Sequence, residues 1–173
     1  MVEIRTIRTE DAQNFLNLGQ TLDTETEWMM LEPGERQLTV EQQARRIHEI
    51  LASENSTLLV AEEAGALVGF LAARGGDWRR NRHAVYIVVG VLQAYVGRGI
   101  GTRLFTELER WATACNIHRL ELTVMAHNTR AIALYQKIGF MLEGTKKDAL
   151  FVNGAYVDEY MMAKLLPAGE SNR

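Results

Sequence analysis

The chain has 173 residues, a length that favours one globular domain with a sizeable core. Apolar residues make up 47% and charged residues 24%, as in soluble globular proteins, which excludes collagen-like, disordered and coiled-coil chains. With 19 basic and 22 acidic residues the formal net charge is −3, and the sequence has no basic stripe of the kind expected of a dedicated nucleic-acid binder.

The first half of the chain predicts elements in the order β-α-α-β-β. Alternating polar and apolar residues predict a strand over 2–7, and apolar residues at helical spacing predict a short helix after it. Thr39 and Gln42 fit a capping box, which indicates the start of a second helix. Two β-prone runs follow, joined by a tight turn at Ala64-Gly65: residues 57–62 and 66–73.

The second half predicts the order β-α-β-α-β-β and contains the strongest helix signal. Apolar residues recur there at the spacing of a helix lying on a sheet: Ile100, Leu104, Leu108, Trp111 and Cys115. Asn153-Gly154 marks a tight hairpin. The other expected elements are a helix at 128–138 and strands at 83–91, 119–125, 140–151 and 155–165. The pattern predicts one α/β (α+β) domain over 1–166, with a mixed sheet flanked by helices, and a short polar tail at 167–173.

A glycine-rich turn precedes the strongest helix. In residues 97–102 (Gly-Arg-Gly-Ile-Gly-Thr), bare backbone N–H groups converge at the positive end of a helix dipole, which predicts an anion site. The alternative is that these glycines only make the turn. A Walker loop would need a lysine before Thr102, and the third glycine falls one residue early for a dinucleotide fingerprint, so both nucleotide motifs fail.

Two motifs resemble those of the GCN5-related N-acetyltransferases. Residues 96–101 (Val-Gly-Arg-Gly-Ile-Gly) are similar to the family's Arg/Gln-x-x-Gly-x-Gly/Ala signature, except that Val96 stands where Arg or Gln is usual. Residues 128–140 are similar to its Asn-x-x-Ala-x-x-Leu-Tyr-x-x-x-Gly-Phe segment. The resemblance covers nearly the whole chain. It implies a mostly antiparallel mixed sheet in which two central parallel strands splay apart to hold acetyl-CoA.

The resemblance also implies which residues bind acetyl-CoA. The fourth strand would bind the pantetheine arm through its backbone, the glycine-rich turn would bind the pyrophosphate, and Asn128 would contact the arm. The strand and turn residues concerned are Val89, Gly90, Val91, Gly97, Arg98, Gly99, Ile100, Gly101 and Thr102. Arg98 either reaches a phosphate or is solvated, and Asn128 has a second, structural role as a helix N-cap.

Two catalytic groups follow from the same resemblance. Tyr135 matches a tyrosine that protonates the departing CoA thiolate in many members, although its place in an apolar helical stripe would by itself make it a core residue. The glutamate base of several members would fall at Thr123, which cannot act as a base. Glu121, two residues earlier on the same strand face, is therefore the first candidate base, followed by Glu27 and Glu32.

The acceptor site is expected between the first two helices, where this family usually forms one wall of that site. There Trp28, beside Glu27 and Glu32, is predicted to bind an amine with a hydrophobic body. The alternative is a loop that packs Trp28 inward and leaves its acids in solvent.

The expected function is acetyl transfer from acetyl-CoA to a primary amine by direct attack in a ternary complex. The expected acceptor is a small molecule such as a free amino acid or a polyamine. Acetylation of ribosomal-protein N-termini and acyl-CoA binding without turnover stay open as alternatives. We expect no metal, nucleic-acid or membrane partner, and a homodimer stays open. With Cys115 as the only cysteine and no signal peptide, a cytoplasmic protein is expected.

Overall fold

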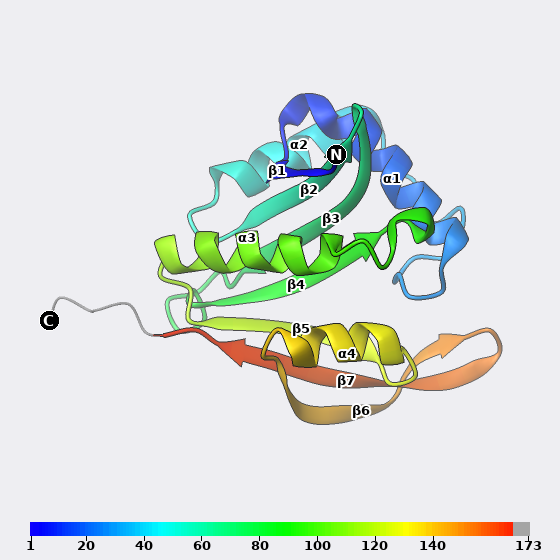
Figure 1. Cartoon of the computed structure of the whole chain (residues 1–173), viewed down its shortest axis with the longest axis vertical. Coiled ribbons are helices and arrows are strands. Elements are labelled where there is room, and N and C mark those ends of the chain that lie inside the picture. Colours follow the sequence, from blue (N-terminus) through cyan, green and yellow to red (C-terminus); the bar gives the residue numbers. More distant parts are fainter. Residues whose placement is uncertain (168–173) are drawn as a thin grey trace, which may run out of the picture.

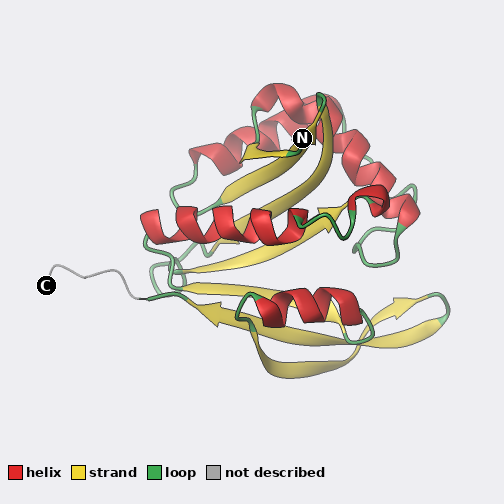
Figure 2. Ribbon diagram, viewed as in Figure 1, coloured by secondary structure: helices red, strands yellow, loops and turns green. Residues whose placement is uncertain are grey.

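The computed structural model describes residues 1–167 and contains a seven-stranded mixed sheet with helices on both faces (Figures 1 and 2). The strands lie in the order β1-β2-β3-β4-β5-β7-β6. Their bounds are β1 Glu3–Thr6, β2 Thr57–Glu63, β3 Ala66–Gly75, β4 Ala84–Val91, β5 Arg119–Met125, β6 Met141–Val152 and β7 Ala155–Leu165. The helices are α1 Ala12–Glu25, α2 Val40–Ala52, α3 Ile100–Ala114 and α4 Thr129–Lys137. The element order predicted from periodicity is confirmed, and residues 168–173 of the expected tail lie outside the described residues.

Each face of the sheet has its own apolar core. Helices α1 and α2 pack on β2 and β3, where the core includes Leu22, Ile47 and Phe70. Helices α3 and α4 lie on the opposite face, where the core includes Leu104 and Phe105. In Figure 1, α3 and α4 are seen side by side in front of the sheet, with α1 and α2 behind β1, β2 and β3. This arrangement leaves the α1/α2 face of the sheet open beyond β4.

The two central strands, β4 and β5, run parallel but pair over only three residues. The paired positions are 84–86 of β4 and 119–121 of β5. Beyond Tyr86 the strands diverge, so residues 87–91 keep their pairing with β3 while the edge that faces β5 has no strand partner. The other strand pairs of the sheet are antiparallel, which confirms the expected mixed sheet with a splayed parallel pair.

Local sequence signals explain where several elements begin. The Thr39 hydroxyl accepts a hydrogen bond from the Gln42 backbone N–H, and the Gln42 side chain accepts one from the Thr39 N–H, so the predicted capping box is present. Asn128 Oδ1 accepts from the Ala131 N–H, which makes Asn128 the N-cap of α4 and shifts the helix start to Thr129. The helices of residues 1–167 are too short or too polar to cross a membrane.

Candidate active site

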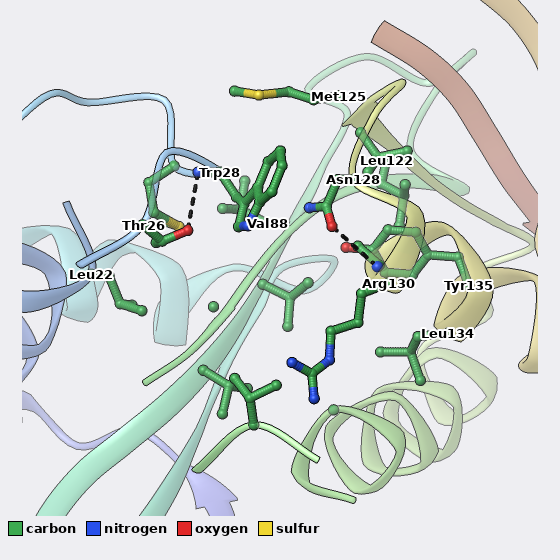
Figure 3. Close-up of a pocket in the computed structure, with 18 of the residues that line it drawn as sticks. Leu22, Thr26, Trp28, Val88, Leu122, Met125, Asn128, Arg130, Leu134 and Tyr135 are labelled. Carbon is green, nitrogen blue, oxygen red and sulfur yellow. Dashed lines mark hydrogen bonds between the residues drawn. The ribbon is translucent and has the colours of Figure 1, made fainter. Parts of the chain in front are cut away.

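A cleft of about 640 Å³ opens where β4 and β5 separate (Figure 3). One side consists of β4 and the α1–α2 loop, including Val88 and Trp28. The other consists of β5 and α4, including Asn128 and Tyr135. The glycine-rich turn closes one end. The cleft therefore brings together residues that are more than 100 positions apart in the sequence.

The glycine-rich turn has the backbone conformation that an anion site needs. Gly97 and Gly99 have φ angles of +84° and +76°, in the left-handed region that favours glycine. Gly99 is the N-cap of α3 and has no side chain to cap the helix, so the first N–H groups stay available at the positive end of the helix dipole. A Cβ on Gly101 would lie 2.9 Å from Leu134 Cδ2, so this glycine also allows α3 and α4 to approach closely.

Two arginines lie near this turn, and the one that lines the cleft is not the predicted one. Arg98 points away: its guanidinium forms an ion pair with Glu63 at 3.1 Å and stacks 4.7 Å from the centre of the Tyr95 ring. Arg130, in the first turn of α4, lines the cleft, and its Nη2 would lie 3.3 Å from a Cβ on Gly97. The glycine-rich turn and the Arg130 guanidinium together form a cradle for a negatively charged group.

Tyr135 projects from α4 into the same cleft and is 7% exposed. Its ring packs against Phe105 and Phe140, so the residue is part of the core and also lines the cleft. Burial raises the pKa of the Tyr135 phenol, and the nearby Tyr86 raises it further. The hydroxyl has no hydrogen-bond partner within residues 1–167, so it is a protonated donor available to a ligand.

A pair of hydroxyls lies on the face of the sheet opposite α4. Tyr86 Oη and Thr123 Oγ1 are 2.7 Å apart, and both residues line the cleft. Tyr86 is the last residue of β4 that pairs with β5, so this bridge lies where the strands begin to diverge. The position that the resemblance assigns to a base is therefore occupied by a hydrogen-bonded threonine.

The three acids predicted as candidate bases lie outside the cleft lining. Glu121 Oε2 accepts a hydrogen bond of 2.6 Å from Arg119 Nε, and Arg119 also binds Glu143. This strand carboxylate is thus held in an ion-pair network. Glu32 lies in the exposed α1–α2 loop, where its backbone N–H donates to Glu35.

Glu27 ties the α1–α2 loop to two other segments. Glu27 Oε2 accepts a hydrogen bond of 2.7 Å from Asn153 Nδ2 in the β6–β7 turn, and Glu27 Oε1 lies 3.5 Å from His127 Nε2. The Trp28 ring packs against the His127 ring, with ring centres 4.9 Å apart and the two planes inclined at 55°. Trp28 lines the cleft, whereas Glu27 lies outside the lining and ties the loop to its neighbours.

The sequence did not single out several residues of the cleft, among them four with side chains that can carry charge or donate hydrogen bonds: Tyr86, His127, Arg130 and Glu159. Arg130 occupies a variable position of the Asn-x-x-Ala motif, and its basic side chain in the first turn of a helix, beside a predicted anion site, was an available signal. Glu159 follows Asp158 in the strand β7, and since strand residues alternate between faces, one of these two acids had to face the open side of the sheet. Tyr86 and His127 carried no such signal.

Comparisons with known proteins agree with this architecture. Residues 22–140 match the Acetyltransferase (GNAT) family. The L-amino acid N-acetyltransferase AaaT of Escherichia coli (strain K12) is 36% identical over 108 residues, which cover 62% of this chain and 67% of that protein. The N-alpha-acetyltransferase RimI of Mycobacterium tuberculosis is 36% identical over 115 residues, which cover 66% of this chain and 69% of that protein.

Solved structures share the whole fold. A GNAT-family acetyltransferase from Streptococcus pneumoniae superposes with a TM-score of 0.93 at 29% identity, covering 96% of this chain and all of that one. The yncA protein of Salmonella typhimurium, solved with its cofactor acetyl-CoA, superposes with a TM-score of 0.87 at 19% identity, covering 100% and 98% of the two chains. The chain therefore belongs to the acetyltransferase (GNAT) family and is an acetyl-CoA-dependent N-acetyltransferase.

Proposed function

We propose that this enzyme acetylates the primary amine of a small molecule, such as a free amino acid or a polyamine. The observation that carries the proposal is the closed acceptor wall. Trp28 lies against the cleft, and Glu27 links the same loop to Asn153 of the β6–β7 turn. An acceptor side bounded by this loop and this turn suits a compact amine.

The residues of the cleft fit acetyl-CoA. The glycine-rich turn and Arg130 suit its phosphates, because backbone N–H groups and a guanidinium are strong donors to phosphate oxygens. The unpaired edge of β4 at Val89, Gly90 and Val91 offers backbone groups to the amides of the pantetheine arm. Asn128 lies in the cleft beside Tyr135 and is proposed to contact the same arm.

Acetyl-CoA supplies an activated acetyl thioester, and the protein supplies position and protons. Holding donor and amine together in one cleft makes the transfer effectively unimolecular. The neutral amine attacks the thioester carbonyl, and its nitrogen releases one proton to solvent as the amide forms. The Tyr135 hydroxyl, which its raised pKa keeps protonated, donates a proton to the departing thiolate and regains one from solvent. A backbone N–H on the free edge of β4 polarises the thioester carbonyl. Glu121 takes no part in this scheme because it is held by Arg119 outside the cleft.

Acetylation of protein N-termini is the second candidate function. The likeness to RimI favours it, as do the apolar side chains on the loop that borders the acceptor side, Met29 and Met30. Such side chains would pack on the first residues of a peptide. This candidate and the first one differ in the acceptor alone.

The test is thiol release from acetyl-CoA with purified protein and separate sets of acceptors: free amino acids, alkyl amines, polyamines and N-terminal peptides. Turnover confined to small amines supports the proposal, whereas turnover confined to peptides replaces it with the second candidate. A protein that binds acetyl-CoA, measured by calorimetry, but leaves the thioester intact with every amine would refute both and would indicate an acyl-CoA-binding module.

A further inference from the structure

Charged side chains mark two separate regions of the cleft. Among the lining residues of the described chain, Arg130 is the one basic residue besides His127, and Glu159 is the one acidic residue. Arg130 lies against the glycine-rich turn. Glu159 lies on β7, beside Met125 of β5. The cleft is thus positive where the phosphates of the donor are proposed to bind and negative at a second, distinct place.

Glu159 is a buried carboxylate with an incomplete set of partners. The residue is 7% exposed. Its nearest cation is Lys146, whose Nζ lies 4.0 Å from Glu159 Oε2, beyond hydrogen-bond distance, and whose side chain is half exposed. The side chain makes no hydrogen bond within residues 1–167. A nearly buried carboxylate is costly unless it is paired, so a cationic ligand in the cleft would stabilise it.

The sheet places Glu159 on the same face as the Tyr86–Thr123 pair. Tyr160 and Met162 pack into the α3/α4 core, so the alternating Glu159 and Met161 face the opposite side. In the β5–β7 ladder Thr123 pairs with Met161 and Met125 pairs with Glu159. The carboxylate therefore lies on the open face, two residues further along the strands than the Tyr86–Thr123 bridge.

Standard strand spacings give the distance between the backbones of Glu159 and Thr123. Two residues along a strand span about 7 Å, and adjacent strands are about 4.8 Å apart, so the backbone of Glu159 lies about 8 Å from that of Thr123. Because both side chains project from the same face of the sheet, their ends are separated by a similar distance. The five bonds between the two nitrogens of a four-carbon diamine, at roughly 1.3 Å each, span about 6.5 Å, and the contacts at its two ends cover the rest.

We propose that Glu159 binds the second ammonium group of a diamine acceptor, whose first amine is acetylated beside Tyr86 and Thr123. The inference rests on the proposed function and narrows it to alkyl diamines and polyamines. The apolar side chains of Trp28 and Leu150, which both line the cleft, suit the methylene chain between the two charges. A free amino acid would instead bring its own carboxylate into the region that Glu159 makes negative.

The experiment compares acceptors that differ by one charge. Initial rates of thiol release are measured with 1,4-diaminobutane, n-butylamine and free amino acids, for the wild type, Glu159→Gln and Lys146→Gln. The wild type is expected to have the highest kcat/KM for the diamine. Because a hydrogen-bonded charge contact commonly changes affinity about ten- to a hundredfold, Glu159→Gln is expected to lower the diamine-to-butylamine ratio of kcat/KM by that factor, mainly through KM. Lys146→Gln, which removes a competing cation outside the cleft lining, is expected to keep the diamine preference.

Three results would overturn the inference. One is an equal loss on diamine and butylamine in Glu159→Gln, with unchanged melting temperature and acetyl-CoA affinity, since this would make Glu159 part of the general machinery. Another is a wild-type preference for amino acids, which would remove the diamine while leaving small-amine acetylation intact. The third is absence of turnover with every amine despite acetyl-CoA binding, which would refute the proposed function itself. A Glu159→Gln protein that fails to fold leaves the wild-type acceptor preference as the deciding measurement.

Discussion

Replacing Tyr135 with phenylalanine should separate catalysis from stability. The hydroxyl makes no hydrogen bond within residues 1–167, while the ring contacts Phe105 and Phe140, which phenylalanine keeps. The free energy of unfolding should therefore change by no more than about 1 kcal/mol, or about 2–4 °C in melting temperature. Loss of a positioned general acid should lower kcat about a hundred- to ten-thousandfold.

The assay for this variant has three parts. Thiol release at saturating acetyl-CoA gives kcat, calorimetry gives acetyl-CoA affinity, and thermal unfolding gives the melting temperature. Tyr156→Phe is the matched control, because Tyr156 is 70% exposed on the β6–β7 hairpin and does not line this cleft. A kcat within twofold of wild type would make Tyr135 a core residue only. A fall in melting temperature of more than about 5 °C would show that the hydroxyl has a structural partner.

Two further predictions concern charged residues, one in the cleft and one near the start of the chain. Arg130→Gln should raise the KM for acetyl-CoA about tenfold, because it removes a charge-assisted contact. Arg98 lies outside the cleft lining and pairs with Glu63, so Arg98→Gln should change this KM less than twofold. A larger effect of Arg98→Gln than of Arg130→Gln would assign the phosphate contact to Arg98. Asp11 binds Arg5 at 2.7 Å, and this hydrogen bond lowers the Asp11 pKa below its usual value. The pair therefore stabilises the fold above the ordinary aspartate pKa of about 4, and this stabilisation is lost as the pH falls through and below that value. Asp11→Asn should cost about 1–3 kcal/mol in urea unfolding at pH 7 and less at pH 3, and an equal cost at both pH values would contradict this account.

Local patterns in the sequence were sufficient for the order of elements and the glycine-rich turn. Helical and strand periodicities act over a few residues, and turn chemistry acts over even fewer, so they can be recognised without tertiary contacts. Asn153 and Gly154 illustrate this, since both have positive φ angles in the predicted hairpin. The capping box at Thr39 is another such signal. The family likewise followed from two short motifs.

The charged residues of the cleft depended on contacts between distant segments. From the sequence, Glu121 was the first candidate base, but it lies outside the cleft lining, where it is bound to Arg119 of the same strand, and Arg119 also binds Glu143 of β6. Glu159 gained its place from the pairing of β7 with β5, and Arg130 gained its place from the approach of α4 to the glycine-rich turn.

The sequence by itself determined which secondary structures form and which family motifs they carry, because those depend on short-range periodicity and backbone conformation. Tertiary structure alone decided which acid and which arginine face the cleft. Successive strand residues point to opposite faces of the sheet, and each charged side chain can pair with more than one partner. Which acid and which arginine reach the cleft therefore depends on strand register and on the separation of β4 from β5.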